Sequence, residues 1–152
     1  MNVDLQTRLA MSPEDVWQRV LTPDLLFHIA APLVRFRFVG CEVPVQWSDG
    51  SRYLVAIKLF GLLPFGEQWI VPTLQSDPAG VWPRRLRDNG HSALIKTWDH
   101  WITIAPDGQG GTLYRDEVEV QAGLLTPFIW VFAQIFYRHR QRRWRSLARG
   151  HS

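Results

Sequence analysis

Two ionisable residues on a predicted β-hairpin are the strongest candidates for chemistry in this sequence. His100 and Asp116 lie on either side of the turn in PDGQG, and each alternates with aromatic or aliphatic residues in TWDHWITI and TLYRDEVEV. The turn predicts that His100 lies opposite Asp116 on the inward face of the hairpin. A carboxylate buried there needs a partner, because an unpaired charge in an apolar environment is costly. The pair could act as general acid and base, orient a ligand, or tie the sheet to the C-terminal helix.

The rest of the chain predicts the elements that hold this hairpin. Residues 3–9 alternate as a half-buried strand does, and SPEDVW and TPDLLFHI each start a short helix with a hydroxyl residue followed by proline. Turn-forming residues in SDGS, GLLPFG, SDPAG, RDNG and APDGQGG separate the strands that follow. These strands are predicted over residues 33–39, 52–60, 68–74, 81–87, 93–104 and 112–121. A long helix then starts at Thr126, as its cap, and Pro127, which makes the fold class α+β.

The C-terminal segment FIWVFAQIFYRHRQRRWRSLAR changes from apolar to arginine-rich at its middle. The apolar run spans residues 124–137, which is shorter than the roughly 20 residues that a bilayer crossing needs. One face of the predicted helix is formed by Phe128, Val131 and Ile135 and continues as a row of arginines. Beside it lies an apolar seam that we expect to pack on the sheet. The seam contains Ile129, Phe132, Phe136 and Leu147, with Trp144 at its edge. We expect the arginines to pair with sheet acids such as Glu117 and Glu119 or to stay solvated.

Composition excludes several classes of protein. The 17 basic and 14 acidic residues give a net charge of +3, and the six arginines between positions 138 and 149 supply all of the excess, so a nucleic-acid partner is not expected. Cys41 is the only cysteine, which rules out an intrachain disulfide, and the N-terminus has no signal-peptide pattern. We expect one domain over residues 1–152, located in the cytoplasm. No motif for a metal, nucleotide or other cofactor is present, so none is expected.

Four local motifs, in their order along the chain, resemble the SRPBCC or START-like helix-grip superfamily. They are GLLPFG, RDNGHSALIKTWDHW, GGTLYRDEVEV and YRHRQRRWRSL. The sequence is similar to the ligand-binding members described as polyketide cyclase or dehydrase-like, or as associated with cell-division inhibitors. It departs from them at His91 and Ser92, where relatives often have Gly-Pro, and at Trp101 and Ile102, where a second histidine is common. The resemblance implies a curved antiparallel sheet of about seven strands wrapped around a long C-terminal helix.

The resemblance also implies a cavity between the sheet and this helix, with GLLPFG as a lid at its mouth. Strand alternation suggests which side chains could line such a cavity or fill the core beside it. These candidate ligand-contacting residues are Phe36, Phe38, Tyr53, Val55, Ile57, Trp69, Val71, Trp98, His100, Ile102, Tyr114, Asp116 and Val118, with Phe132 and Phe136 from the helix.

Three functions fit these features. The first is binding of a small hydrophobic or lipid-like molecule without catalysis. The second is a cyclase or dehydratase-type enzyme that uses the same cavity, with His100 and Asp116 as catalytic candidates and no metal or nucleotide. The third is an interaction module that uses the basic helix end on an anionic surface or partner. A monomer and a homodimer both remain open.

Overall fold

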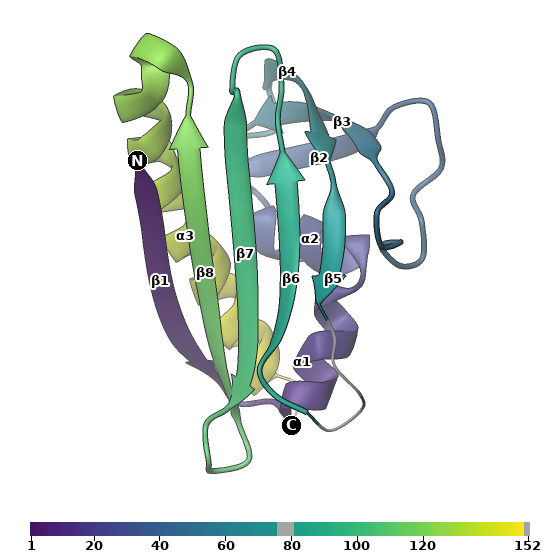
Figure 1. Cartoon of the computed structure of the whole chain (residues 1–152), viewed down its shortest axis with the longest axis vertical. Helices are drawn as coiled ribbons and strands as arrows, with labels where there is room; N and C mark the ends of the chain where they lie inside the picture. The colour runs from purple at the N-terminus through teal and green to yellow at the C-terminus, as the bar shows by residue number, and fades with distance from the viewer. Residues whose placement is uncertain (76–80, 151–152) are drawn as a thin grey trace.

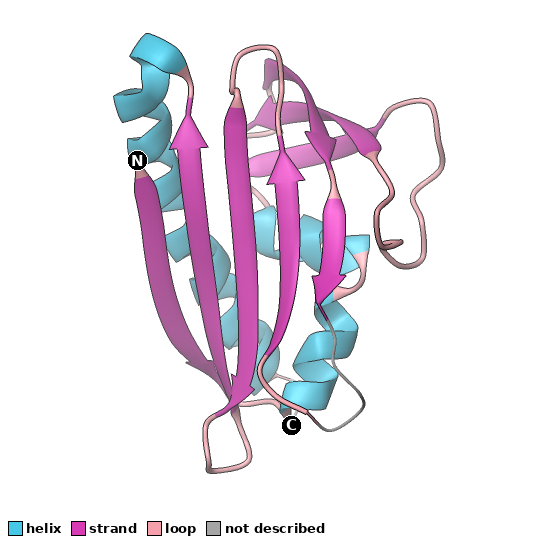
Figure 2. Cartoon of the chain, in the orientation of Figure 1, coloured by secondary structure: helices cyan, strands magenta, loops and turns pink. Residues whose placement is uncertain are grey.

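A computed structural model describes residues 1–75 and 81–150, and its elements follow the predicted order with one additional strand (Figures 1 and 2). The turn expected at residues 76–80 lies outside the described residues. The elements are β1 (Asn2–Leu9), α1 (Pro13–Val20), α2 (Pro23–Ala30), β2 (Val34–Phe38), β3 (Tyr53–Leu59), β4 (Leu63–Ile70), β5 (Pro72–Gln75), β6 (Arg84–Gly90), β7 (Thr97–Pro106), β8 (Thr112–Gln121), the short 3-10 turn η1 (Gly123–Leu125) and α3 (Thr126–Arg149).

The strands form two antiparallel sheets, one ordered β1-β8-β7-β6-β5 and one ordered β2-β3-β4. The single strand expected over residues 68–74 is wrong, because these residues belong to both sheets. β4 ends at Ile70, and β5 begins at Pro72, a residue that has no N–H to continue a ladder. The chain therefore passes from the small sheet to the large one at Val71.

The predicted faces of the β7–β8 hairpin are confirmed, but the predicted pairing is wrong by two residues. His100 lies opposite Val118, and Ile102 lies opposite Asp116. The loop lies one residue later than the prediction assumed, because Pro106 pairs with Thr112. Within this loop, the Asp107 carboxylate accepts hydrogen bonds from the N–H groups of Gln109 and Gly111, at 2.7 and 2.9 Å. A shift of two residues leaves each side chain on its face, so His100 and Asp116 still point inward.

Both short helices begin as predicted. The Ser12 hydroxyl accepts a hydrogen bond from the Asp15 N–H at 3.2 Å, and the Thr22 hydroxyl accepts one from the Leu25 N–H at 3.4 Å. The expected cap of the long helix is wrong. Thr126 is the first residue of α3, and its hydroxyl accepts from the Ala122 N–H and donates to the Gly123 carbonyl, at 2.8 and 2.7 Å, so it stabilises η1 instead.

The long helix α3 packs along the inner side of β1 and β8 and beside α2 (Figure 1). Its buried residues are Ile129, Ala133, Phe136, Tyr137, Arg140, Gln141, Trp144 and Ala148. Ile129 and Phe136 of the predicted seam are buried, Phe132 and Leu147 are half-buried, and Trp144 is fully covered. The neighbouring stripe of Phe128, Val131 and Ile135 is exposed. Among the described helices, none has the length and apolar character required to span a membrane.

Of the two expectations for the helix arginines, pairing with Glu117 and Glu119 is wrong, whereas Arg142 is exposed to solvent as the other expectation states. Those acids lie on the outer face of the large sheet, and Glu117 pairs there with Arg85 and Arg115. The helix arginines find other partners on the inner side, because α3 covers that face. Arg143 donates to the His28 carbonyl at 2.9 and 3.1 Å, and Arg145 donates to the Thr7 hydroxyl at 2.9 Å. The architecture is thus the α+β helix-grip fold, in which α3 is fixed to β1 and α2.

Candidate functional site

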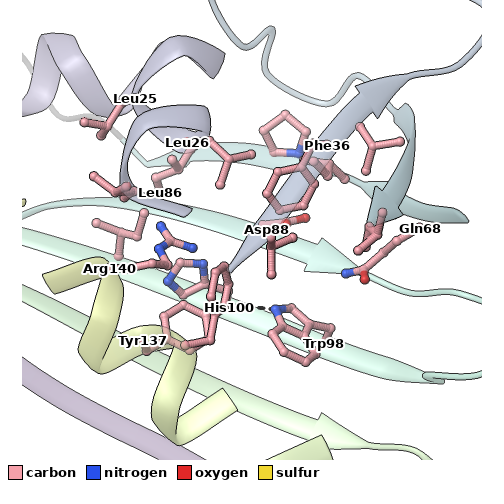
Figure 3. A pocket seen from close by; sticks show the side chains of 18 of the residues that line it. Leu25, Leu26, Phe36, Gln68, Leu86, Asp88, Trp98, His100, Tyr137 and Arg140 are labelled. Carbon is pink, nitrogen blue, oxygen red and sulfur yellow. Dashed lines mark hydrogen bonds between the residues drawn. The ribbon is translucent and has the colours of Figure 1, made fainter. Parts of the chain in front are cut away.

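An interior cavity of about 120 Å³ lies between β6, β7, the small sheet and the helices α2 and α3 (Figure 3). Its walls are mostly apolar, as in most ligand pockets, and a few polar side chains reach it. Side chains from α2, including Leu25, Leu26 and Ile29, form one wall that the sequence did not predict. One face of α2 is therefore part of the candidate site as well as of the core.

Eight of the predicted ligand-contacting residues line this cavity. They are Phe36, Val55, Ile57, Trp98, His100, Ile102, Phe132 and Phe136. The predicted lid also divides into two parts. Leu62 and Leu63 of this segment are exposed, whereas Phe65 lies in β4 and contributes to the cavity wall.

The other seven predicted residues do not line the cavity, for three reasons. On β8, Tyr114, Asp116 and Val118 are covered by α3, with Trp144 packed on Tyr114 at a centroid distance of 5.7 Å. Phe38 and Tyr53 instead pack with Trp47 in an aromatic cluster beside the cavity.

The remaining two are Trp69 and Val71. Their side chains do not face the cavity, because β4 is irregular. The pairing of β3 and β4 shifts between Ala56 and Lys58, and Gly66 has a φ of 87°. Such a bulge changes which side chains alternate inward. After the bulge, Gln68 and Ile70 face the cavity, while the ring of Trp69 lies 4.5 Å from the Arg52 guanidinium carbon.

The two catalytic candidates form one buried hydrogen-bonded unit. Nε2 of His100 lies 2.7 Å from Oδ1 of Asp116, and Gln141 donates to the other Asp116 oxygen at 3.0 Å. The same Gln141 amide donates to the Leu5 carbonyl at 2.9 Å. Asp116 is fully buried and His100 is 5% exposed. Only His100 reaches the cavity, so Asp116 could act on a ligand only through the imidazole.

The surroundings of this pair determine its protonation. Burial lowers the pKa of His100, and the hydrogen bond to Asp116 offsets this only in part. Burial alone would raise the pKa of Asp116, but the hydrogen bond from His100 and the charge of Arg140 bring it below its usual value. At neutral pH the imidazole is therefore neutral and donates its Nε2 proton to an ionised carboxylate.

A second hydrogen-bonded pair connects the sheet to α3. The indole Nε1 of Trp98 donates to the Tyr137 hydroxyl at 2.9 Å, and the Tyr137 ring lies 4.8 Å from the His100 ring. Burial raises the pKa of Tyr137, so the phenol stays protonated. Trp98, His100 and Tyr137 thus form a continuous aromatic wall on one side of the cavity (Figure 3).

Three charged residues of the cavity lining were missed by the sequence analysis. Arg87 pairs with Asp99 at 2.8 Å, and the other two are Asp88 and Arg140. Asp88 on β6 lies opposite His100, accepts a hydrogen bond from the Val71 N–H at 2.9 Å, and has a pKa raised to about 7 by burial. Arg140 on α3 is buried, with its guanidinium carbon 4.9 Å from the Tyr137 ring and 5.6 Å from the Phe136 ring.

Asp88 and Arg140 both carried a signal in the sequence. Asp88 follows Leu86 at the two-residue spacing of a strand, but the predicted strand stopped at residue 87. Arg140 follows Phe136 by four residues, the spacing of one helix face. Within the described part of the chain, no three His, Cys, Asp or Glu side chains are placed to share a metal ion.

Comparison with known proteins identifies the family. The model of a domain of unknown function, DUF8410, matches residues 7–148. This chain belongs to the DUF8410 family. No curated protein sequence matches this DUF8410 chain significantly.

Solved structures similar to this DUF8410 chain share its fold. A START superfamily protein from Mycobacterium smegmatis has a TM-score of 0.61 and 17% identity, over 99% of each chain. A protein from Chromobacterium violaceum has a TM-score of 0.65 and 17% identity, over 97% of this chain and 96% of that one. Norcoclaurine synthase from Thalictrum flavum, in complex with a transition-state analogue, has a TM-score of 0.66 and 13% identity, over 99% and 95%. These similarities confirm the predicted helix-grip fold.

Proposed function

We propose that this DUF8410 protein binds a small hydrophobic molecule in the cavity between the sheet and α3, without changing it chemically. The observation that carries the proposal is the cavity with mostly apolar walls from α2, α3 and both sheets. Burying a ligand surface against such walls is favourable at about 25 cal/mol per Å² of apolar area. Polar groups in contact with the cavity then orient the ligand.

The hydrogen bonds of the His100–Asp116 pair support a binding role over a catalytic one. Each Asp116 oxygen accepts a hydrogen bond, from His100 or from Gln141. Gln141 also bonds to the β1 backbone. The carboxylate therefore connects β7, β8 and α3, which supports the interpretation that the pair ties the sheet to the C-terminal helix.

A matched pair of isoleucine substitutions tests ligand binding. Ile57→Phe adds a ring to the cavity wall, and Ile135→Phe makes the same change on the exposed side of α3. Calorimetry with an apolar probe such as 1-octanol should show binding that Ile57→Phe reduces about tenfold or more and Ile135→Phe leaves unchanged. Native mass spectrometry of the purified protein would show whether a ligand is retained. Equal affinity in both variants would exclude this cavity as the binding site.

An enzymatic function of cyclase or dehydratase type is the second candidate. The observation that favours it is that the His100 imidazole lines the cavity while its Nε2 bonds to a buried carboxylate, an arrangement suited to proton transfer. A similar structure, norcoclaurine synthase, is an enzyme. Turnover of a bound compound that is lost in both His100→Gln and Asp116→Asn, while binding persists, would support catalysis. Binding with no turnover in the wild-type protein would support the first proposal.

A further inference from the structure

The cavity contains a buried arginine that lacks a direct counterion. Arg140 reaches the cavity from α3 (Figure 3) and is 6% exposed. Its Nε is buried without a hydrogen-bond partner. Among the described residues, none of the ion pairs within 4.0 Å includes Arg140. Burying a charge in this way is expensive, because the desolvation cost is repaid only by a well-placed partner.

The nearby groups leave the donors of Arg140 available. The rings of Phe136 and Tyr137 contact the guanidinium at 5.6 and 4.9 Å, which favours a cation but satisfies none of its in-plane N–H groups. The Tyr114 hydroxyl is close to Arg140 and helps to raise the pKa of the guanidinium, but no hydrogen bond of ordinary geometry joins the two groups. A neutral phenol is in any case no counterion.

The two nearby carboxyl groups are engaged elsewhere. Asp116 accepts hydrogen bonds from His100 and Gln141, and Asp88 accepts one from the Val71 N–H. The charge of Asp116 favours the charged form of Arg140 from a distance, but the two side chains form no ion pair. The cavity thus presents a fork of guanidinium donors beside apolar walls.

We propose that the ligand of this cavity is a small apolar acid whose carboxylate binds Arg140. This inference rests on the proposed binding function and specifies its ligand class. A planar carboxylate matches the guanidinium fork with two parallel hydrogen bonds. The hydrocarbon part contacts apolar side chains such as Phe36, Leu26 and Leu86. The cavity volume of about 120 Å³ is comparable to that of a cavity of about 150 Å³ that takes benzene, so a short chain or a single ring fits best.

Pairs of acids and alcohols with the same carbon skeleton test this proposal. Calorimetry or ligand-observed NMR would compare hexanoate with 1-hexanol, octanoate with 1-octanol, and phenylacetate with 2-phenylethanol. We expect at least one acid to bind the wild-type protein about tenfold more tightly than its alcohol. Arg140→Gln should lose about tenfold in affinity for that acid and retain the affinity for the alcohol within about twofold. Arg140→Lys should fall between them, because it keeps the charge without the planar fork.

Arg142→Gln is the matched control, because Arg142 is exposed on the same helix. It should bind both members of each pair as the wild-type protein does. Alcohol binding in Arg140→Gln also shows that the variant is folded. Equal affinity for acids and alcohols would overturn this inference and leave the proposed function standing. No binding of either class would overturn the proposed function itself. Tighter Arg140-dependent binding of octyl phosphate than of octanoate would overturn the carboxylate assignment.

Discussion

Nε2 of His100 lies 2.7 Å from Oδ1 of Asp116 although the two residues are not opposite each other on β7 and β8. Their contact is diagonal, between residues two positions out of direct register, which side chains of this length can span. Gln141 completes the contact from α3 at 3.0 Å. Three elements therefore meet at one buried carboxylate, and the consequences of removing its charge are measurable.

Asp116→Asn should destabilise the protein by about 2–3 kcal/mol near neutral pH, because it removes the acceptor charge from a buried network. Urea unfolding measures this loss, and Glu119→Gln on the exposed outer face is a matched control. The lowered pKa of Asp116 means that its stabilisation is present above the unfolded-state pKa of about 4 and is lost as the pH falls through the folded-state pKa. A variant as stable as the control would contradict a structural role.

Asp88 should give the opposite pH dependence. Its pKa is raised to about 7, so between about pH 4 and pH 7 the folded protein holds a proton that the unfolded chain releases. Stability should therefore decrease as the pH rises through this window. Asp88→Asn keeps an acceptor for the Val71 N–H and should remove this decrease. Between pH 5 and pH 8, the stability of the variant should therefore rise by about 1–3 kcal/mol relative to that of the wild-type protein. Urea unfolding midpoints at both pH values measure this change in stability. An equal decrease in the variant would exclude Asp88 as the source of the pH dependence.

Tyr137→Phe should cost about 1–3 kcal/mol, because it leaves the buried Nε1 of Trp98 without an acceptor. Tyr53→Phe is the control, since its hydroxyl accepts the Ser48 N–H at 3.1 Å in an exposed position where water can replace it. We expect the control to lose under about 1 kcal/mol. Thermal unfolding followed by circular dichroism compares the two, and similar losses would mean that the Trp98 hydrogen bond adds nothing specific.

Thr126→Ala should weaken the junction between β8 and α3 by about 1 kcal/mol. Its hydroxyl joins the Ala122 N–H to the Gly123 carbonyl, so the loss should appear as faster hydrogen exchange at Ala122. Ser12→Ala provides a comparison, because it removes an ordinary N-cap and should cost a similar amount. Unchanged exchange at Ala122 in Thr126→Ala would show that η1 is held by other contacts.

Local patterns were sufficient to predict much of this fold. The alternation in TWDHWITI and TLYRDEVEV predicted which side chains of β7 and β8 face inward, because an even shift in register preserves the face. The caps at Ser12 and Thr22 followed from side-chain chemistry within a few residues. The resemblance to START-like proteins supplied the helix-grip arrangement that these patterns do not determine.

The failures came from features that depend on distant parts of the chain. The bulge at Gly66 changed the face of Trp69, and coverage by α3 removed Tyr114, Asp116 and Val118 from the cavity. The spacing of four residues from Phe136 places Arg140 on the same helix face, but Arg140 looked like one member of a basic segment, and the packing of α3 is what buries it. Neither α3 coverage nor the burial of a charge can be read from periodicity alone.

The hydrogen bond between Asp88 and the Val71 N–H provides a way to detect a molecule bound in the cavity. Val71 joins the two sheets, and its amide is bonded to a carboxyl group that contacts the cavity. A molecule entering the cavity beside Asp88 would alter the shielding of that single amide proton even if it moved no backbone atom. The Val71 amide resonance is thus a built-in spectroscopic probe of cavity occupancy, and one titration followed in an amide correlation spectrum would read it.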